Sequence, residues 1–203
     1  MTQDDKTPMF NWHTREQLLG RRIVVLDGPL DDDNGTLLMT QLLTLAAEDA
    51  RTGISLWIHS PGGSVPAMLA IRDVMRLLPC EVSTLALGLA CSAGQFLLSS
   101  GSPGRRFALP HARILMHQGS AGIGGSAVEV EVQADDLRHT VQTVLGIIAA
   151  DTGQPFDRVY EDSLHDRWFS AEQAREYGFI DGIVESFGQV VPQRQPIGIG
   201  ARA

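Results

Sequence analysis

The first half of the chain alternates short apolar runs with amphipathic segments, and this order constrains the fold more than any other feature. Four runs have the length and apolar character of buried strands and are bounded by glycine, proline or acidic residues: 22–26, 54–59, 82–87 and 114–117. Between the early runs, apolar residues recur at helical spacing: Leu37, Leu38, Leu42, Leu45, Ala46, and then Met68, Ile71, Val74, Met75, Leu78. Strands that alternate with helices favour parallel crossover connections. The sequence therefore predicts an α/β fold.

The second half contains one long predicted helix and one short one. A glycine-rich stretch, 119–125, leads into Ser126-Ala-Val-Glu129, which has the capping-box pattern of a helix start. Behind it, an apolar stripe repeats over about five turns: Val130, Ala134, Leu137, Val141, Val144, Leu145, Ile148. This stripe packs either on the chain's own domain or on another subunit, and periodicity does not choose. A second capping-box pattern, Ser170-Ala-Glu-Gln173, predicts a short helix ending near Gly178.

Composition limits the kinds of partner and compartment. A chain of 203 residues suits one core, and its net charge of −8 disfavours nucleic acid and anionic membranes as partners. Neither Cys80 nor Cys91 belongs to a pair with metal-ligand spacing, so we expect no disulfide framework and no zinc site. The N-terminus has no signal-peptide pattern and no segment suits a membrane span. We expect a cytoplasmic protein.

Ser92 is the first residue that could carry chemistry. It lies among small residues, after a strand pattern and before a predicted helix at 95–100. The N–H groups of a helix's first turn lack partners and can stabilise the oxyanion formed when a serine attacks an acyl group. The turn Ser60-Pro-Gly-Gly-Ser64 brings a second candidate donor, the N–H of Gly63. Taken alone, Ser92 suits an N-cap and the glycines suit a plain tight turn.

Histidine and aspartate candidates are harder to choose. His117 ends an apolar strand pattern and could act as a base, but His59 has a similar position and either could be structural. Four aspartates, Asp151, Asp157, Asp162 and Asp166, lie in one polar segment, and any of them could orient a histidine. The pattern does not say which.

Five segments, in order and in register, together resemble the proteolytic subunit of the Clp protease, ClpP, from about Leu18 to Val184. They are Ser60-Pro-Gly-Gly63, Gly88-Leu-Ala-Cys-Ser-Ala-Gly94-Gln-Phe-Leu-Leu, Ile114-Leu-Met-His-Gln118, Thr152-Gly-Gln154 and Asp166-Arg-Trp-Phe-Ser-Ala171. The resemblance implies a serine endopeptidase with Ser92 as nucleophile, His117 as general acid/base and Asp166 as the orienting carboxylate. It also implies an oxyanion hole formed by the N–H groups of Gly63 and Ala93.

The same resemblance implies a fold, an assembly and partners. The expected fold is the crotonase-like β/α spiral with a protruding handle helix at about 126–150, and the expected assembly is two stacked heptameric rings. The domain would span 18–186, between a divergent N-terminal segment, 1–17, and a flexible tail, 187–203. The expected partner is a ring-shaped AAA+ unfoldase that delivers unfolded proteins and uses ATP, while this chain needs no cofactor or metal. Trp57 falls where the family carries an aromatic residue of the ATPase-docking pocket, although a core tryptophan is an equal alternative.

Departures from the family pattern keep two alternatives open. Ala93 replaces a usual methionine, and no proline follows in His117-Gln-Gly-Ser-Ala. Leu164 and His165 stand where the family has an acid–arginine pair at the ring contact, and 1–17 do not match the axial gate. A weakly active or regulatory ring subunit that needs a paralogue or ligand is therefore the main alternative. An acyl-CoA enzyme of the crotonase type is a distant one.

Overall fold

A parallel sheet forms the centre of the fold in the computed structural model, which describes residues 12–119 and 122–192. The strands of this sheet are β1 (Ile23–Asp27), β2 (Ile54–Ser60), β3 (Val82–Cys91), β4 (Arg106–Ala108), β5 (Arg113–Met116), β6 (Arg167–Phe169) and β7 (Gly182–Ile183). Their order is β1-β2-β3-β4-β7, with β5 paired to β3 and β6 paired to β5. All pairs are parallel except β5 with β6.

Strand β3 is longer than the predicted run 82–87 and divides the sheet. Its first part, at Thr84–Ala86, pairs with β4, and its last part, at Leu89–Cys91, pairs with β5. The register with β2 shifts between Ile58 and Ser60, where the His59 ring lies so close to Gly88 that an added Cβ would be 3.2 Å from it. The strand continues past this irregularity, and its last part pairs with β5 instead of β4.

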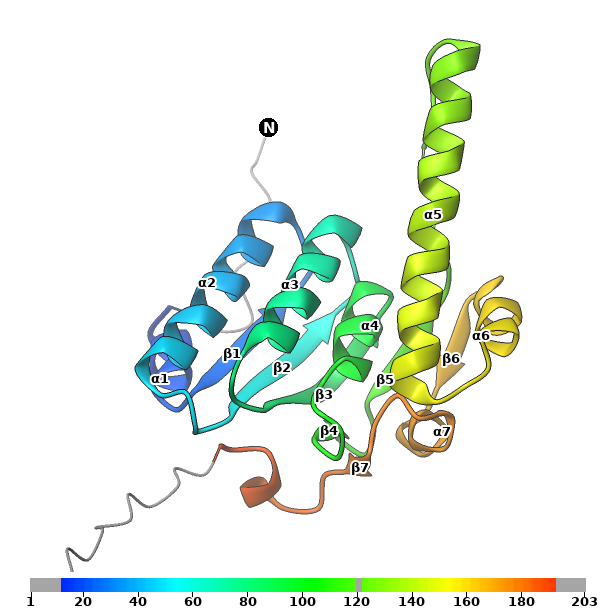
Figure 1. The fold of residues 1–203 in the computed structure, drawn as a ribbon. Coiled ribbons are helices and arrows are strands. Elements are labelled where there is room, and N and C mark those ends of the chain that lie inside the picture. The colour runs from blue at the N-terminus through cyan, green and yellow to red at the C-terminus, as the bar shows by residue number, and fades with distance from the viewer. Residues whose placement is uncertain (1–11, 120–121, 193–203) are drawn as a thin grey trace, which may run out of the picture.

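Helices α2 (Asp32–Glu48), α3 (Val65–Leu77) and α4 (Ala93–Ser99) lie side by side on one face of the sheet (Figure 1). Side chains from these helices and from the strands meet in a core whose fully buried members include Leu42, Leu56, Ile58, Ile71, Phe96 and Leu97. Helix α1 (Trp12–Leu19) packs against β1, while α6 (Phe156–Ser163) and α7 (Ala171–Tyr177) lie beyond β5 and β6. The predicted α/β class is confirmed.

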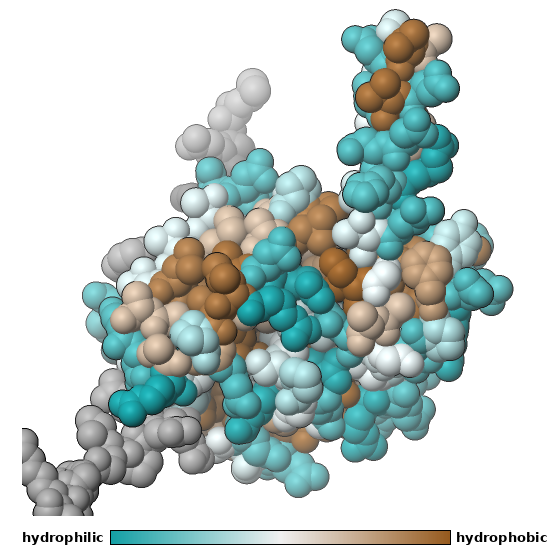
Figure 2. Space-filling view, viewed as in Figure 1, coloured by the Kyte–Doolittle hydropathy of each residue, from teal (hydrophilic) through white to brown (hydrophobic). Residues whose placement is uncertain are grey.

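Helix α5 (Ala127–Thr152) projects from the rest of the molecule (Figure 1). Ser126 caps its first turn, and Ser126 and Glu129 complete both halves of the predicted capping box. We call 127–136 the distal segment and 137–152 the root. No side chain of the distal segment is buried, whereas Leu145 and Ile148 of the root belong to the core. In Figure 2 the middle of the projecting helix is hydrophilic and its free end carries hydrophobic side chains.

A buried carboxylate fixes the C-terminal end of the root to two other helices. Asp151, whose side chain is 5% exposed, lies 2.7 Å from the Arg76 guanidinium and 3.4 Å from that of Arg72, both on α3. Ser100, at the end of α4, donates a hydrogen bond to Asp151 at 3.0 Å. The Arg106 guanidinium also donates to the Asp151 carbonyl oxygen at 2.7 Å.

Some expected features fall partly outside the described residues. Residues 1–11 of the predicted N-terminal segment and 193–203 of the predicted tail are among them, so the domain boundaries stay predictions. Within the tail, Phe187–Gln189 forms a short 3-10 helix, η1. Over 12–119 and 122–192, no helix has both the length and the apolar character that crossing a membrane requires.

Candidate active site

Ser92 occupies a strained turn between β3 and α4. Its backbone has φ 53° and ψ −115°, which is uncommon for a residue with a side chain. The Ser92 N–H donates to the Leu115 carbonyl at 2.9 Å, and its carbonyl accepts from the Phe96 N–H at 2.9 Å, so hydrogen bonds hold both sides of the residue. Although Ser92 is at the N-cap position, its hydroxyl makes no capping bond to α4. Ser92 therefore holds the N-cap position that the sequence suggested, but its side chain does not cap the helix.

The glycine turn after β2 lies directly against Ser92. A Cβ added to Gly62 would be 2.7 Å from the Ser92 Cβ and 3.3 Å from its Oγ. Gly63 has φ 147° and approaches Leu30 so closely that a Cβ would be 2.0 Å from the Leu30 oxygen. Ser60 supports the turn by accepting a hydrogen bond from the Gly62 N–H at 3.1 Å. Only glycine fits here, and the lack of side chains lets the backbone of the turn lie next to the serine.

The antiparallel pair β5–β6 brings His117 and Asp166 together. Met116 is the register partner of Arg167, so the next residue along β5 faces the residue just before Arg167. Asp166 Oδ1 accordingly lies 3.3 Å from His117 Nδ1, with side-chain exposures of 64% and 30%. This geometry leaves His117 Nε2 for a second partner.

The competing histidine and aspartates lie elsewhere in the structure. The His59 ring packs on Gly88 within the sheet. Asp151 binds Arg72 and Arg76, and Asp162 accepts from the Tyr177 hydroxyl at 3.0 Å. Asp157 is exposed on α6. Among the sequence candidates, His117 and Asp166 are the pair that the fold brings together.

A cavity of about 220 Å³ opens beside Ser92 and His117. Its wall comes from α3, α4, the residues after β5 and the root of α5: Val65, Met68, Ser92, Gln95, Phe96, His117, Gln118, Gly119, Leu137, Thr140, Val141, Val144, Leu145, Ile148. Val141 and Val144 show the domain-packing alternative for this part of the stripe, because they pack on the core of their own domain and line this cavity. A contact of the stripe with another subunit stays a prediction. Nothing in the stripe's periodicity marked Val141 and Val144 as cavity residues.

Cys91, next to Ser92, is a poor nucleophile in this setting. Burial raises the pKa of its thiol to about 11, with a smaller contribution from the Asp166 carboxylate. The thiol therefore stays protonated at neutral pH. Cys80 is also buried and unbonded.

The remaining predicted site residues lie away from the cavity wall. Trp57 is half-buried on β2, and its Nε1 is buried without a hydrogen-bond partner among the described residues. Leu164, 51% exposed, and the exposed His165 lie between α6 and Asp166. Within 12–119 and 122–192, no cluster of three histidine, cysteine or acidic side chains could hold a metal ion.

Comparison with known proteins gives consistent matches over most of the chain. The model of the family described as Clp protease matches residues 8–187. The chain is 53% identical over 189 residues to ATP-dependent Clp protease proteolytic subunit 1 of Streptomyces avermitilis, covering 93% of this chain and 87% of that protein. It is 52% identical to subunit 3 of Streptomyces coelicolor with the same coverage. It is 51% identical over 171 residues to subunit 2 of Corynebacterium diphtheriae, covering 84% and 86% of the two chains.

Proposed function

This chain belongs to the Clp protease family, and we propose that it is a serine-type proteolytic subunit whose triad is Ser92, His117 and Asp166. One observation carries the assignment of residues. The Ser92 hydroxyl is free of any capping role and shares a cavity with His117, whose Nδ1 is 3.3 Å from Asp166. The matches are to proteolytic subunits and give no support to an acyl-CoA enzyme.

The chemistry follows from these positions. Ser92 Oγ attacks the carbonyl carbon of a peptide bond while its proton passes to His117 Nε2. His117 returns this proton to the amine as the C–N bond breaks, which leaves an acyl group on Ser92. Water then attacks with His117 as base, releases the carboxylic acid and restores the hydroxyl. Asp166 stabilises the charged imidazole and keeps Nδ1 protonated.

The N–H groups of Gly63 and Ala93 would stabilise the oxyanion. The close approach to Ser92 of Gly62, the preceding residue of the turn, supports this role for Gly63. Ala93 is the first residue of α4, where an N–H has no partner within the helix. In related chemistry, losing one such donor costs about 10²–10³ in kcat.

The assembly and partners follow from family membership. We infer two stacked heptameric rings, of this chain or of this chain with a paralogous subunit, that admit unfolded proteins delivered by a ring-shaped AAA+ unfoldase. Support comes from the relatives' description as ATP-dependent and from the exposed apolar Val128 and Val132 on the distal segment. Trp57 is the candidate for ATPase docking, and Leu164 with His165 for ring contact. The two free, buried cysteines suit a reducing cytoplasm.

The test is peptide hydrolysis by the purified chain and by Ser92→Ala. The substitution should lower kcat by about 10⁴-fold or more, because a triad acts as a unit. Cys91→Ala is the matched control, since the protonated thiol plays no part in the reaction. Undiminished hydrolysis by Ser92→Ala would contradict the triad, even if the chain proved to be a peptidase.

A further inference from the structure

Two glutamines in the wall of the active-site cavity differ from their surroundings. Gln95 comes from α4 and Gln118 follows His117, whereas eight other wall residues are aliphatic, aromatic or methionine. Polar groups in such an apolar setting are costly unless they form hydrogen bonds. The hydrogen-bond partners of the two amides therefore help to determine which side chains the cavity accepts.

Gln118 has an unused donor. Its backbone N–H donates to the Ser163 carbonyl at 2.9 Å, so the chain is anchored at this residue. Its side-chain Nε2 is buried but has no hydrogen-bond partner among the described residues. No hydrogen bond to a described residue fixes this end of the amide, and the terminal torsion of glutamine rotates easily. The amide can therefore turn to donate to an acceptor that enters the cavity.

Gln95 complements it with an acceptor. The side chain is 1% exposed, and its Nε2 donates to Ser99 Oγ at 3.3 Å, within the same helix. With the donor end engaged there, the amide oxygen is the end that remains for an incoming group.

The lack of charged side chains in the cavity wall also limits which substrate side chains the cavity can accept. Among the described residues of the wall, His117 is the one ionisable side chain, and none is lysine, arginine, aspartate or glutamate. A charged group that entered would lose its hydration without gaining an opposite charge. The cavity should therefore discriminate strongly against glutamate and lysine side chains.

We propose that this cavity receives the side chain of the substrate residue whose carbonyl Ser92 attacks, and that it selects an apolar stem with an uncharged, hydrogen-bonding tip. Glutamine has this chemistry: its amide oxygen accepts from Gln118 and its amide N–H donates to Gln95. Gln118 and Gln95 are then specificity-determining residues. The inference rests on the proposed peptidase function, because it assigns a substrate class to the same site.

The experiment compares three fluorogenic peptides that differ only in this residue: glutamine, methionine of similar shape, and glutamate of similar shape but charged. The full-length chain is measured beside Gln118→Met and Gln95→Met, with Gln142→Met as control on an exposed position of α5. The ratio of kcat/KM for glutamine to that for methionine should fall about tenfold in Gln118→Met and be unchanged in Gln142→Met. The glutamate peptide should be cleaved at least 100-fold more slowly than the glutamine peptide, as expected for burial of an unpaired charge.

A glutamine-to-methionine ratio that is the same in the parent and in both cavity variants would overturn the inference while leaving the peptidase function intact. If no peptide is turned over, rates of inactivation by matched peptidyl chloromethyl ketones give the same ratio. Failure of these reagents to modify Ser92 or His117 would contradict the peptidase function, and the inference with it.

Thermal unfolding separates an effect on specificity from an effect on folding. Gln118→Met removes an unpaired donor and should not lower the midpoint of thermal unfolding. A lowered midpoint in both Gln118→Met and Gln118→Leu would show that the donor is satisfied within the protein, which also overturns the inference.

Discussion

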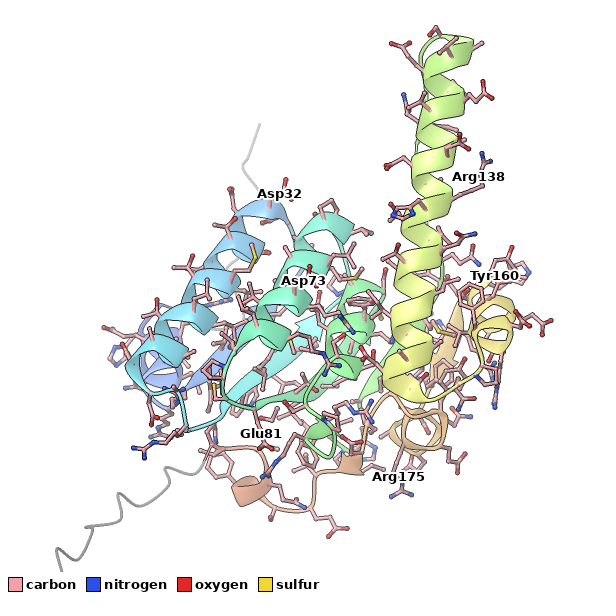
Figure 3. All side chains as sticks on the ribbon, viewed as in Figure 1. Asp32, Asp73, Glu81, Arg138, Tyr160 and Arg175 are labelled. Carbon is pink, nitrogen blue, oxygen red and sulfur yellow. The ribbon has the colours of Figure 1, made fainter. Side chains whose placement is uncertain are left out.

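The two ends of α5 carry the same kind of apolar residue in different surroundings. In the root, Leu145 is 1% exposed and Ile148 is 3% exposed, and Asp151 anchors the last turn. In the distal segment, Val128 is 71% exposed and Val132 is 63% exposed. Arg138 projects from the middle of α5 (Figure 3), where it forms an ion pair with Asp135 and both side chains are exposed. The root is part of the catalytic domain, whereas no side chain of the distal segment is buried.

This difference bears on the periodic stripe, which suggested either a domain contact or a subunit contact. Its members in the root, Val141, Val144, Leu145 and Ile148, pack in the domain, whereas Val130 and Ala134 of the distal segment are half-buried, and the subunit contact stays a prediction. Because Leu137, Val141 and Val144 also line the cavity, a displacement of the root would change the proposed substrate site. Substitutions in the two parts should therefore act on different properties of the protein.

The largest expected contrast comes from placing a charge in each part. Leu145→Asp would bury an unpaired carboxylate in the core and should destabilise the fold by several kcal/mol, about 4 or more. Val132→Asp, on the exposed distal segment, should leave the unfolding midpoint of the single chain unchanged. In sedimentation, Val132→Asp should shift the protein toward single rings or smaller species. Unchanged double rings would contradict a role of the distal segment in ring contact.

A second contrast compares two aspartates of α5. Asp151→Asn removes a nearly buried charge from two arginines and should cost about 2–3 kcal/mol, somewhat below the range for a fully buried pair because Arg76 is 42% exposed. Asp135→Asn, whose pair with Arg138 is exposed on both sides, should cost less than about 0.5 kcal/mol. Urea unfolding measures both. Equal losses would mean that the root is not fixed by its ion pairs.

A third contrast compares two capping boxes. Ser170 caps α7, whose Ala171, Ala174 and Tyr177 are buried, so Ser170→Ala should lower global stability by about 1 kcal/mol. Ser126 caps the free end of α5, and Ser126→Ala should fray the first turn without changing the global midpoint. Amide hydrogen exchange at 127–131 should increase in Ser126→Ala alone. A drop in the global midpoint for Ser126→Ala would contradict the independence of the distal segment.

The smallest expected effect is a pH dependence of local stability, confined to the first turn of α5. The Ser126 N–H, 2.7 Å from Glu129 Oε2, lowers the pKa of Glu129 below its ordinary value of 4.5. The hydrogen bond between Ser126 and ionised Glu129 contributes its full stabilisation at pH values above the ordinary pKa. This stabilisation is lost as the pH falls through the lowered pKa of the folded state. Protection of 127–131 against hydrogen exchange, relative to the intrinsic exchange rate at each pH, should therefore decrease locally as the pH falls below the ordinary pKa of Glu129. Glu129→Gln should remove this pH dependence while retaining an acceptor for the Ser126 N–H.

The sequence predicted the parts of the fold that rest on local chemistry. The capping boxes at Ser126 and Ser170 begin helices at the expected residues, and Gly178 ends α7 in the left-handed conformation. The short strands β4, β6 and β7 were missed, because two or three residues carry no periodic signal and depend on neighbours distant in the chain. Strand β3 ran past its predicted end because its last residues pair with β5, a tertiary effect.

In the candidate active site, too, local sequence pattern predicted some features and tertiary contacts determined the others. Spacing alone could not choose between His59 and His117 or among four aspartates, because the choice depends on the register of β5 with β6. The resemblance to a family chose the pair, and the 3.3 Å approach of His117 to Asp166 agrees with it. The Gln118 donor, which has no partner among the described residues, and the cavity position of Val141 had no signal in the sequence, since each depends on which surfaces meet in three dimensions.

The central claim is that Ser92 is a nucleophile activated by His117. The most direct measurement is mass spectrometry of the native protein after reaction with a fluorophosphonate, beside His117→Ala and a urea-unfolded sample. The account predicts an adduct on Ser92 in the native protein alone, because activation requires the folded arrangement of Ser92 with the imidazole. An adduct on another residue, or equal labelling of Ser92 in His117→Ala, would contradict it.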